Sequence, residues 1–388
     1  MGIVVGIDAS RNRSGGAKVR LAGVLGGGDP ARHGIEAVHV WAHRALLAEL
    51  PDAPWLTKHN PPALEGSLQS EVWWQLWSLP VALRRHSCDV LLSMDAGTVS
   101  RFRPAVVMSQ DMLSFEPGEM ARYAYSKAYF RLVLLKYIQM SSLRRAAGAL
   151  FLTDYAATLM QRYTGSLPSV RIIPHGIEET FSRQSSMRRT SAAPAQPVRC
   201  LYVSNVDMYK HQWQVVRAVA KLRSEGFPVV LTLVGRKSPG AGELLDRVIA
   251  EEGAADFVEL VEEVPHATIA DYLSRSDLFV FASSCENMPN TLIEAMASGL
   301  PIACSKRGPM PEILQDGGSY FDPEKPESIA AAIKELLTDS GRRQASAVRA
   351  RALAGKYTWA RCANDTWQYL AEVARTRAGK QLAQVSVL

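Results

Sequence analysis

Residues 278–301 read LFVFASSCENMPNTLIEAMASGLP, which is the pattern of an apolar strand, a polar loop and a short helix. The first five residues are continuously apolar, as in a parallel strand that is buried on both faces. Asn290 is a suitable N-cap, and the residues after it predict a helix over 291–298 that Gly299 terminates. The carboxyl end of a buried strand therefore leads into a helix whose first N–H groups are free.

The same alternation of apolar strand-like runs with helical stretches extends along most of the chain. Strands that are apolar on both faces predict parallel sheets covered by helices, which is an α/β fold. The strand-like runs are residues 3–7, 90–93, 105–108, 149–152, 170–173, 200–203, 229–234, 257–260, 278–281 and 302–303.

The alternation is interrupted once, at residues 182–198, SRQSSMRRTSAAPAQPV, which have the composition of a linker. We therefore expect two doubly wound, Rossmann-like domains at residues 1–181 and 199–355, facing a central cleft. Residues 356–388 predict a helix that packs back on the N-terminal domain.

Composition narrows the class of protein. The 388 residues are 47% hydrophobic and 21% charged, which excludes a disordered chain, a collagen-like repeat and a small disulfide scaffold. The five cysteines are widely spaced and odd in number, so we expect reduced thiols in a cytoplasmic protein. The first residues lack the basic segment of a signal peptide, and no apolar run is long enough for a membrane span. The net charge of +6 predicts an anionic partner.

Two glutamates, Glu286 and Glu294, lie eight positions apart, one in the loop and one inside the predicted helix. Because an unpaired buried carboxylate costs several kcal/mol, Glu294 needs a hydrogen-bonding partner, for which ribose hydroxyls are suitable. A helix N-terminus suits a diphosphate. Two unrelated surface glutamates would be the ordinary interpretation of such a pair, but the flanking strand, cap and stop favour a nucleotide-sugar site.

The segment CENMPNTLIEAMASGLPI, residues 285–302, resembles the E-x7-E signature of the retaining glycosyltransferases of family 4, which have the two-domain GT-B fold. The resemblance is strongest over residues 200–325. It implies that Glu286 contacts the transferred sugar near the reacting carbon and that Glu294 binds the nucleotide ribose.

By the same resemblance, the backbone at Asn290, Thr291 and Leu292 lies near the donor diphosphate. In the stretch VEEVPH, residues 261–266, the backbone around Val264 lies where the family binds the base. Backbone contacts leave no trace in a sequence, so the identity of the base stays open.

A second matching segment is LYVSNVDMYKHQWQVVRAV, residues 201–219. The family usually has Gly-Arg after this strand and a lysine shortly afterwards, and both neutralise the diphosphate. Lys210 matches the lysine, whereas Ser204 and Asn205 replace Gly-Arg. Lys210 is therefore expected to carry more of the phosphate charge alone; a solvated lysine at a helix start is the alternative.

The loop DASRNRSGGAK, residues 8–18, resembles the Gly-Gly loop that lies beside the donor phosphates and the acceptor in this family. Gly15 and Gly16 would let the backbone approach a phosphate or a sugar. The loop is neither G-x-G-x-x-G nor G-x-x-x-x-G-K-[ST], which argues against a dinucleotide oxidoreductase and a P-loop NTPase.

Three further residues of the N-terminal domain are candidates for contact with the sugar or the acceptor. In VMSQDMLSFEP, residues 107–117, Asp111 is retained where the family often shows His-Asp, and Gln110 replaces the histidine. Gln110 can hydrogen-bond but cannot exchange a proton near neutral pH. His175 follows the last strand of the domain, and a structural role is as well supported as a substrate contact.

We expect no metal and no cofactor besides the nucleotide-sugar, because the sequence contains no Asp-x-Asp pair for a diphosphate-bound ion. Residues 120–145 contain six basic residues and no acidic one, interleaved with aromatic residues. They predict either an interfacial segment on an anionic membrane, at the inner face of the plasma membrane, or a partly buried helix. The stretch EVWWQLWSLP, residues 71–80, fits either core aromatics or a surface wedge, and core aromatics are favoured. No nucleic-acid-binding pattern is present, so no such partner is expected.

The function expected from the residues and the resemblance together is that of a metal-independent hexosyltransferase. It would be a retaining enzyme that moves a hexose from a UDP- or GDP-sugar to a hydroxyl of a glycan or lipid-linked glycan, in cell-surface polysaccharide or lipopolysaccharide synthesis. Three alternatives stay open: a sugar-nucleotide epimerase of the same fold, a glycogen-synthase-like polymerase of the same fold, and a non-catalytic two-lobed sugar-binding protein.

Overall fold

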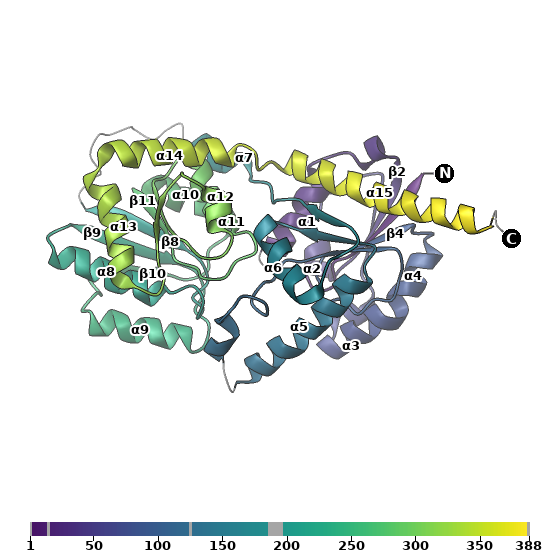
Figure 1. The fold of residues 1–388 in the computed structure, drawn as a ribbon, viewed down its shortest axis with the longest axis horizontal. Coiled ribbons are helices and arrows are strands. Elements are labelled where there is room, and N and C mark those ends of the chain that lie inside the picture. Colours follow the sequence, from purple (N-terminus) through teal and green to yellow (C-terminus); the bar gives the residue numbers. More distant parts are fainter. Residues whose placement is uncertain (1, 14–15, 124–125, 185–196, 386–388) are drawn as a thin grey trace. The chain divides into compact units, whose positions relative to one another are not determined.

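The computed structural model describes residues 2–13, 16–123, 126–184 and 197–385, and it contains two compact units, each with its own parallel sheet (Figure 1). Unit 1 consists of Met1–Phe115, Tyr123–Gly176 and Thr358–Leu388, and unit 2 of Glu116–Arg122 and Ile177–Tyr357. The α/β class and the two Rossmann-like sheets are therefore confirmed. That the two units face a central cleft stays a prediction.

The boundaries of the units differ from the predicted ones. The chain leaves unit 1 after Gly176, before the expected linker at 182–198, because α7 (Glu179–Gln184) already packs in unit 2 against α10 and α11. Of that expected linker, residues 185–196 lie outside the described residues. The short segment Glu116–Arg122 belongs to unit 2, which the sequence did not predict.

Unit 1 is built on a seven-stranded parallel sheet in the order β3-β2-β1-β4-β5-β6-β7. The C-terminal helix α15 packs against α1 and contacts strands β1 and β4, and its Trp367 is fully buried. The strands are β1 (Ile3–Asp8), β2 (Ile35–Trp41), β3 (Leu56–His59), β4 (Val90–Ser93), β5 (Ala105–Met108), β6 (Gly148–Phe151) and β7 (Val170–Ile172); the α-helices are α1 (Gly16–Gly26), α2 (Arg44–Leu47), α3 (Leu68–Trp73), α4 (Leu79–Arg85), α5 (Lys127–Arg145), α6 (Asp154–Thr164) and α15 (Trp359–Val385).

An apolar cluster joins the strands of unit 1 to α4. Trp41 of β2 packs there with Leu79 and Leu83 of α4, and Leu91 of β4. Gly6 of β1 makes this packing possible, because a Cβ there would lie 2.2 Å from Leu83 Cδ2.

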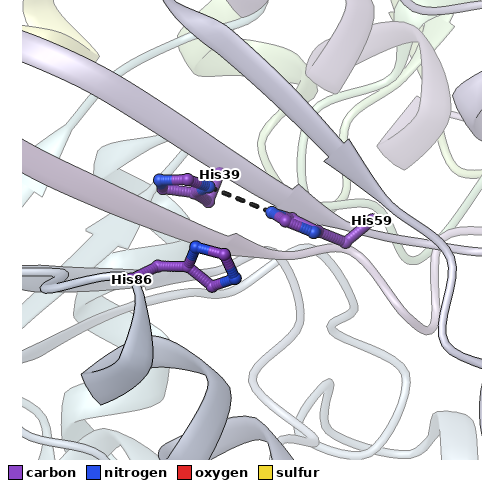
Figure 2. Close-up of side chains that lie close together, drawn as sticks. All are labelled: His39, His59 and His86. Carbon is purple, nitrogen blue, oxygen red and sulfur yellow. Dashed lines mark hydrogen bonds between the residues drawn. The ribbon is translucent and has the colours of Figure 1, made fainter.

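Three histidines converge beside this apolar cluster. The rings of His39, His59 and His86 point toward one another, and the pairs of ring centroids lie 4.5–5.2 Å apart (Figure 2). Burial lowers the pKa of His59 to about 4, and the neighbouring His86 and His39 contribute to the shift. The His59 imidazole is therefore neutral near pH 7.

The stretch 71–80 only partly fulfils the expectation of a core segment. Trp74 is buried, but Trp73 is 67% and Trp77 is 52% exposed. The stretch is helical, since α3 continues into the short π-helical segment η3 (Trp74–Ser78). The face of the helix that carries Trp74 is therefore buried, and the face that carries Trp73 and Trp77 is exposed. All five cysteines are buried free thiols. Among the described residues, no helix combines the length and the apolar character that a membrane crossing requires.

Unit 2 is built on a six-stranded parallel sheet in the order β10-β9-β8-β11-β12-β13. Helices α8, α9 and α13 form one packed group, and α7, α10, α11, α12 and α14 form a second (Figure 1). The strands are β8 (Val198–Val203), β9 (Val229–Val234), β10 (Val258–Val261), β11 (Leu278–Phe281), β12 (Ile302–Ser305) and β13 (Ser319–Phe321); the helices not yet delimited are α8 (Gln212–Ser224), α9 (Ala241–Glu251), α10 (His266–Arg275), α11 (Asn290–Ala297), α12 (Met310–Leu314), α13 (Pro326–Thr338) and α14 (Ser340–Ala354).

Gly235, directly after β9, is needed where two strand ends approach closely. Its φ is +146°, and a Cβ there would lie 2.2 Å from the carbonyl oxygen of Ser204. Both the backbone conformation and the space therefore exclude a larger residue.

We expect Gly235→Ala to destabilise unit 2 by about 3 kcal/mol or more, because the change adds backbone strain to a clash with backbone atoms. Thermal unfolding followed by circular dichroism would measure the loss. Gly341→Ala is the matched control, because Gly341 lies in α14 and a Cβ there would meet only one atom, at 3.4 Å. Alanine should stabilise that helix slightly, and equal melting temperatures for the two variants would contradict this expectation.

Candidate functional site

The candidate site of unit 2 lies where two neighbouring parallel strands end. Strands β8 and β11 pair in parallel, so their carboxyl ends meet at one edge of the sheet. The loop after β8 carries Lys210, and the loop after β11 carries Glu286. In open α/β sheets this edge is where ligands bind.

Lys210 and Glu286 form an ion pair through Lys210 Nζ and Glu286 Oε1. Their side chains are 12% and 14% exposed. The ammonium group also lies 4.9 Å from the ring centroid of Tyr209 and 5.7 Å from that of Phe281. The two residues that the sequence singled out as catalytic are thus in contact, and each neutralises the other in a largely desolvated place.

The backbone of Lys210 is fixed by the strand that precedes it. The Tyr202 hydroxyl of β8 donates to the Lys210 carbonyl over 2.7 Å, and the Lys210 N–H donates to the Asp207 carbonyl over 2.9 Å. Burial raises the pKa of Tyr202 well above its usual value, so this hydroxyl stays a donor. The position of the lysine therefore depends on the core of the sheet.

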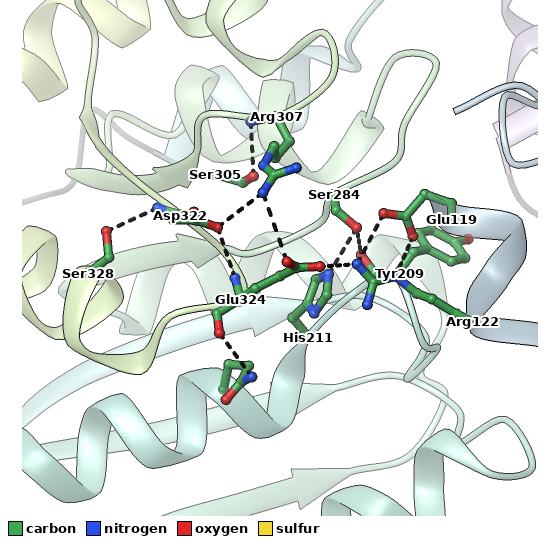
Figure 3. A network of polar contacts seen from close by, with 11 residues as sticks. Glu119, Arg122, Tyr209, His211, Ser284, Ser305, Arg307, Asp322, Glu324 and Ser328 are labelled. Atoms are coloured by element: carbon green, nitrogen blue, oxygen red, sulfur yellow. Dashed lines mark hydrogen bonds and ion pairs between the residues drawn. The ribbon is translucent and has the colours of Figure 1, made fainter. Parts of the chain in front are cut away.

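Tyr209 and His211, the two neighbours of Lys210 in the sequence, belong to a polar network (Figure 3). His211 follows Lys210, and its Nε2 lies 2.9 Å from the hydroxyl of Ser284. Burial lowers the pKa of His211 to about 4, so the ring is neutral. The Ser284 hydroxyl also reaches the Tyr209 carbonyl at 3.2 Å. Ser284 of the loop after β11 therefore holds the loop after β8 through both sequence neighbours of Lys210.

The same network holds the segment Glu116–Arg122 on unit 2 (Figure 3). Arg122 Nε donates to Glu119 over 2.8 Å, and Arg122 Nη2 bonds to Glu324. Glu324 Oε2 in turn lies 3.9 Å from Arg307. The hydrogen bond from Arg122 lowers the pKa of Glu324. The sequence did not predict these residues, because a contact between positions 122 and 324 has no local signal.

Helix α11 begins one residue earlier than predicted, and Asn290 is not its N-cap. The cap position is Pro289, with extended backbone and no capping side chain, and Asn290 is the first helical residue. The side-chain oxygen of Asn290 is buried and has no hydrogen-bond partner among the described residues. The half-buried Thr291 and the buried Leu292 complete the first turn. The N–H groups of this turn are thus left without a side-chain cap.

Glu294, one turn further along α11, is 4% exposed. One of its oxygens, Oε1, lies 2.8 Å from His266 Nε2, and the other, Oε2, is buried with no partner among the described residues. A buried carboxylate oxygen without a donor is costly. Glu294 therefore offers one acceptor site to a ligand hydroxyl. His266 is a site residue that the sequence did not single out, although it ends the stretch 261–266.

The hydrogen bond to Glu294 raises the pKa of His266 above its usual 6.5, and Glu178 adds to the shift. Because the folded-state pKa is raised, protonated His266 contributes fully to the stability of the fold below pH 6.5. This contribution is lost as the pH rises through the folded-state pKa.

We therefore expect the melting temperature of the wild type, measured relative to His266→Gln, to decrease between pH 6 and pH 9. Differential scanning fluorimetry of both proteins across this range would test it. A difference that does not change with pH would contradict the assigned pair.

The remaining predicted donor residues lie at the neighbouring strand ends of unit 2. Ser204 donates its N–H to Val234 over 2.9 Å, and the Asn205 carbonyl accepts from Gln212 Nε2 at 2.9 Å. Val264 is half-buried between β10 and α10. The side chains of Ser204 and Asn205 carry no positive charge. In the loop after β8, Lys210 is therefore the cation that contacts Glu286.

The residues predicted in the N-terminal half lie in unit 1. Gly15 is outside the described residues, and Gly16 is the first residue of α1. Gln110, after β5, donates to the Met94 carbonyl over 2.6 Å. Asp111 is exposed and accepts from the Leu113 N–H at 2.9 Å.

His175 is buried in unit 1, with its Nδ1 3.4 Å from the guanidinium of Arg20. Burial and the charge of Arg20 lower the pKa of His175 well below its usual value. Arg20 also donates to the Ile173 carbonyl over 2.9 Å. These contacts give His175 a structural role within unit 1.

Within the described ranges, one group of three histidine, cysteine or acidic residues is arranged so that it could hold a metal ion, and it is His39, His59 and His86. It includes no carboxylate, and it lies in unit 1. Independence of the donor site from a metal stays a prediction.

Comparison with known proteins agrees with this geometry. The family model of glycosyl transferases group 1 matches residues 184–353, which include Lys210, Glu286 and Glu294. This segment, which is less than half of the chain, is similar to that family. The predicted resemblance is confirmed at the level of a GT-B glycosyltransferase family, and the matched segment covers most of unit 2.

Relatives of known function match part of the chain. A D-inositol 3-phosphate glycosyltransferase of Thermobispora bispora is 29% identical over 241 residues, which are 57% of this chain and 55% of the relative. The O-antigen chain mannosyltransferase B of Escherichia coli is 28% identical over 170 residues, 43% of this chain and 44% of the relative. This chain spans between 44% and 60% of the length of the curated relatives it matches.

Solved structures match the whole chain at low identity. Sucrose-phosphate synthase from Thermosynechococcus elongatus has a TM-score of 0.72 at 16% identity and covers 99% of both chains. HepE of Anabaena, solved in complex with UDP-glucose, has a TM-score of 0.71 at 17% identity and covers 97% of this chain and 100% of its own. At this identity the likeness shows the fold alone.

Proposed function

We propose that this chain is a retaining hexosyltransferase of glycosyltransferase family 4, which transfers a hexose from a UDP- or GDP-sugar to a hydroxyl of a glycan or lipid-linked glycan. One observation carries the proposal: the buried Oε2 of Glu294 lacks a partner among the described residues, and it lies one turn after the uncapped start of α11. A nucleoside diphosphate supplies what both features need, namely hydroxyl donors for the carboxylate and an anion for the helix N-terminus.

In the proposed reaction, the charge of the departing diphosphate is stabilised by Lys210 and by the first N–H groups of α11. Glu286 stabilises the positive charge that develops on the sugar as the bond to the diphosphate breaks. Because Lys210 and Glu286 are paired beforehand, an incoming diphosphate competes for the ammonium group and releases the carboxylate. Donor binding would thus place each charge where the reaction needs it.

The proposed site contains no carboxylate cluster among its described residues, and Lys210 with the helix N-terminus would neutralise the diphosphate without a metal ion. Transfer rates that are equal in a chelator and in added Mg²⁺ would agree with this. Strict dependence on a divalent ion would contradict it.

A panel of UDP, GDP, ADP and their sugars in a thermal-shift assay tests the donor class. A ligand that binds the folded state raises the melting temperature by mass action. We expect one nucleoside diphosphate to give the largest increase and its sugar to be the donor, which labelled-product analysis on a glycan acceptor would follow. The absence of any shift across the panel would overturn the proposal.

We also propose that the acceptor is a glycolipid and that the surface of unit 1 contacts an anionic membrane during cell-surface glycan synthesis. On α5, Phe130, Leu134 and Tyr137 are 62–67% exposed and recur at helical spacing. Lys127 and Arg131 of the same helix are exposed, whereas Lys136 lies over the ring of Tyr163 at 3.9 Å. The exposed face therefore combines apolar and basic side chains, as interfacial helices do.

Flotation with vesicles that contain anionic phospholipid tests the membrane contact. We expect Phe130→Ser/Leu134→Ser to lower the bound fraction several-fold, because both side chains are exposed and their replacement leaves the core intact. Val348→Ser is the matched control, since Val348 is 64% exposed on α14 of unit 2. Equal binding by all three proteins would contradict the proposal.

A further inference from the structure

The three histidines of unit 1 are brought together by separate elements. His39 lies on β2, two positions before Trp41, so both side chains share one face of the sheet. His59, at the end of the edge strand β3, is paired in register with Trp41. His86 is the C-cap of α4, which packs on this face through Leu79 and Leu83.

The geometry of the three rings is that of a ligand set. Each histidine offers one ring nitrogen, and the three nitrogens lie within 4.8 Å of one another. The closest pair, His39 Nδ1 and His59 Nε2, is 3.0 Å apart and shares a hydrogen bond (Figure 2). The ring of Trp41 stacks on His59 with centroids 4.8 Å apart, which orients that imidazole.

We propose that His39, His59 and His86 form a binding site for a divalent transition-metal ion of the zinc class. Imidazole nitrogens suit Zn²⁺, Cu²⁺ and Ni²⁺, whereas Mg²⁺ and Ca²⁺ prefer oxygen ligands that this group lacks. Three histidines leave the fourth position of a tetrahedral ion open to water. On binding, the proton shared by His39 and His59 moves to the outer nitrogen of its ring, and both inner nitrogens become ligands.

Such an ion would join the edge strand β3 to the C-terminal end of α4, and so it would stabilise this side of unit 1. It lies in unit 1, whereas Lys210 and Glu286 lie in unit 2, and this proposal assigns the ion no part in neutralising the donor diphosphate. No local pattern in the sequence marks the site, since the ligands come from positions 39, 59 and 86 and form neither a Cys-x-x-Cys nor a His-x3-His motif.

The test uses the full-length, untagged protein after treatment with a chelator and removal of that chelator. Titration with ZnCl₂ against a chromogenic chelator should show one saturable equivalent. His59→Gln and His86→Gln should each weaken that affinity roughly tenfold or more, because each removes a ligand. His33→Gln is the matched control, since His33 bonds to Asn364 outside this cluster, and it should bind like the wild type.

Two further measurements separate coordination from unfolding. Co²⁺ added to the wild type should give the visible absorption of a tetrahedral nitrogen-ligated ion, and ZnCl₂ but not MgCl₂ should raise its melting temperature. Circular dichroism would verify that both ligand variants are folded. The proposal is overturned if the wild type binds no saturable Zn²⁺, or if folded His59→Gln and His86→Gln bind it as tightly as the wild type; the three rings are then a hydrogen-bonded stack only.

Discussion

Glu286→Gln should reduce hexose transfer at least about a hundredfold and leave binding of the nucleoside diphosphate unchanged or tighter. The two effects have one cause. Glu286 is the ion-pair partner of Lys210, so the neutral amide no longer stabilises charge on the sugar and no longer competes for the ammonium group. Steady-state kinetics with a labelled donor would give the loss in kcat, and isothermal titration with the nucleoside diphosphate would give the affinity.

Two variants serve as controls for Glu286→Gln. Lys210→Met should weaken binding of the nucleoside diphosphate as well as transfer, because it removes the cation itself. Glu225→Gln breaks an exposed ion pair with Lys334 in the same unit and should change neither measurement. A folded Glu286→Gln enzyme with wild-type turnover would remove Glu286 from the reaction, and weaker nucleotide binding would contradict the proposed competition for Lys210.

The sequence predicted the strands that are predominantly apolar, including the partly exposed β7 and β10, and it missed three strands that lack such a run. All ten predicted apolar runs are strands in the structure. The missed strands are β2, β3 and β13. Glu36 and His39 interrupt the apolar pattern of β2, and the edge strand β3 carries Thr57, Lys58 and His59. Pairing with β1 stabilises β2, and this cannot be seen in a local pattern.

The sequence also could not predict how the chain is divided between the units. The segment Glu116–Arg122 is assigned to unit 2 although both of its neighbours in sequence belong to unit 1. The contact between Arg122 and Glu324 holds this segment on unit 2. A hydrogen bond between residues so far apart in the sequence produces no local sequence pattern. Linker composition at 182–198 indicated a boundary in the right region, but the chain had already entered unit 2 at Ile177.

At the candidate site, the roles of the residues stay predictions, and the structure shows contacts that the sequence did not predict. Lys210 and Glu286 lie on the loops after the paired strands β8 and β11 and are in contact there, which the sequence did not predict. Asn290 was expected to cap α11, as asparagine often does, but Pro289 takes the cap position, and the Asn290 oxygen has no partner among the described residues. His266 was missed because its contact with Glu294 depends on how α10 and α11 pack, and the spacing of residues in the sequence does not reveal that packing.

Glu294→Ala is expected to weaken binding of the nucleoside diphosphate roughly 10- to 100-fold, which is the effect of losing a hydrogen bond to a charged group. The physical reason is that the buried Oε2 of Glu294 has no partner among the described residues, so a ribose hydroxyl would satisfy it. Isothermal titration of the wild type and the variant with the best ligand of the thermal-shift panel would measure the loss.

A dideoxyribose analogue of the same nucleotide separates recognition of the ribose from general damage to the site. The wild type should bind the analogue more weakly than the natural nucleotide, whereas Glu294→Ala should bind both equally, since the hydroxyls and the carboxylate act only as a pair. His266→Gln keeps the Oε2 acceptor and should lose less affinity than Glu294→Ala. Glu263→Ala, at an exposed position, should bind like the wild type. If Glu294→Ala still binds the natural nucleotide more tightly than the dideoxyribose analogue, another residue binds the ribose hydroxyls. The Oε2 atom of Glu294 then has a different partner.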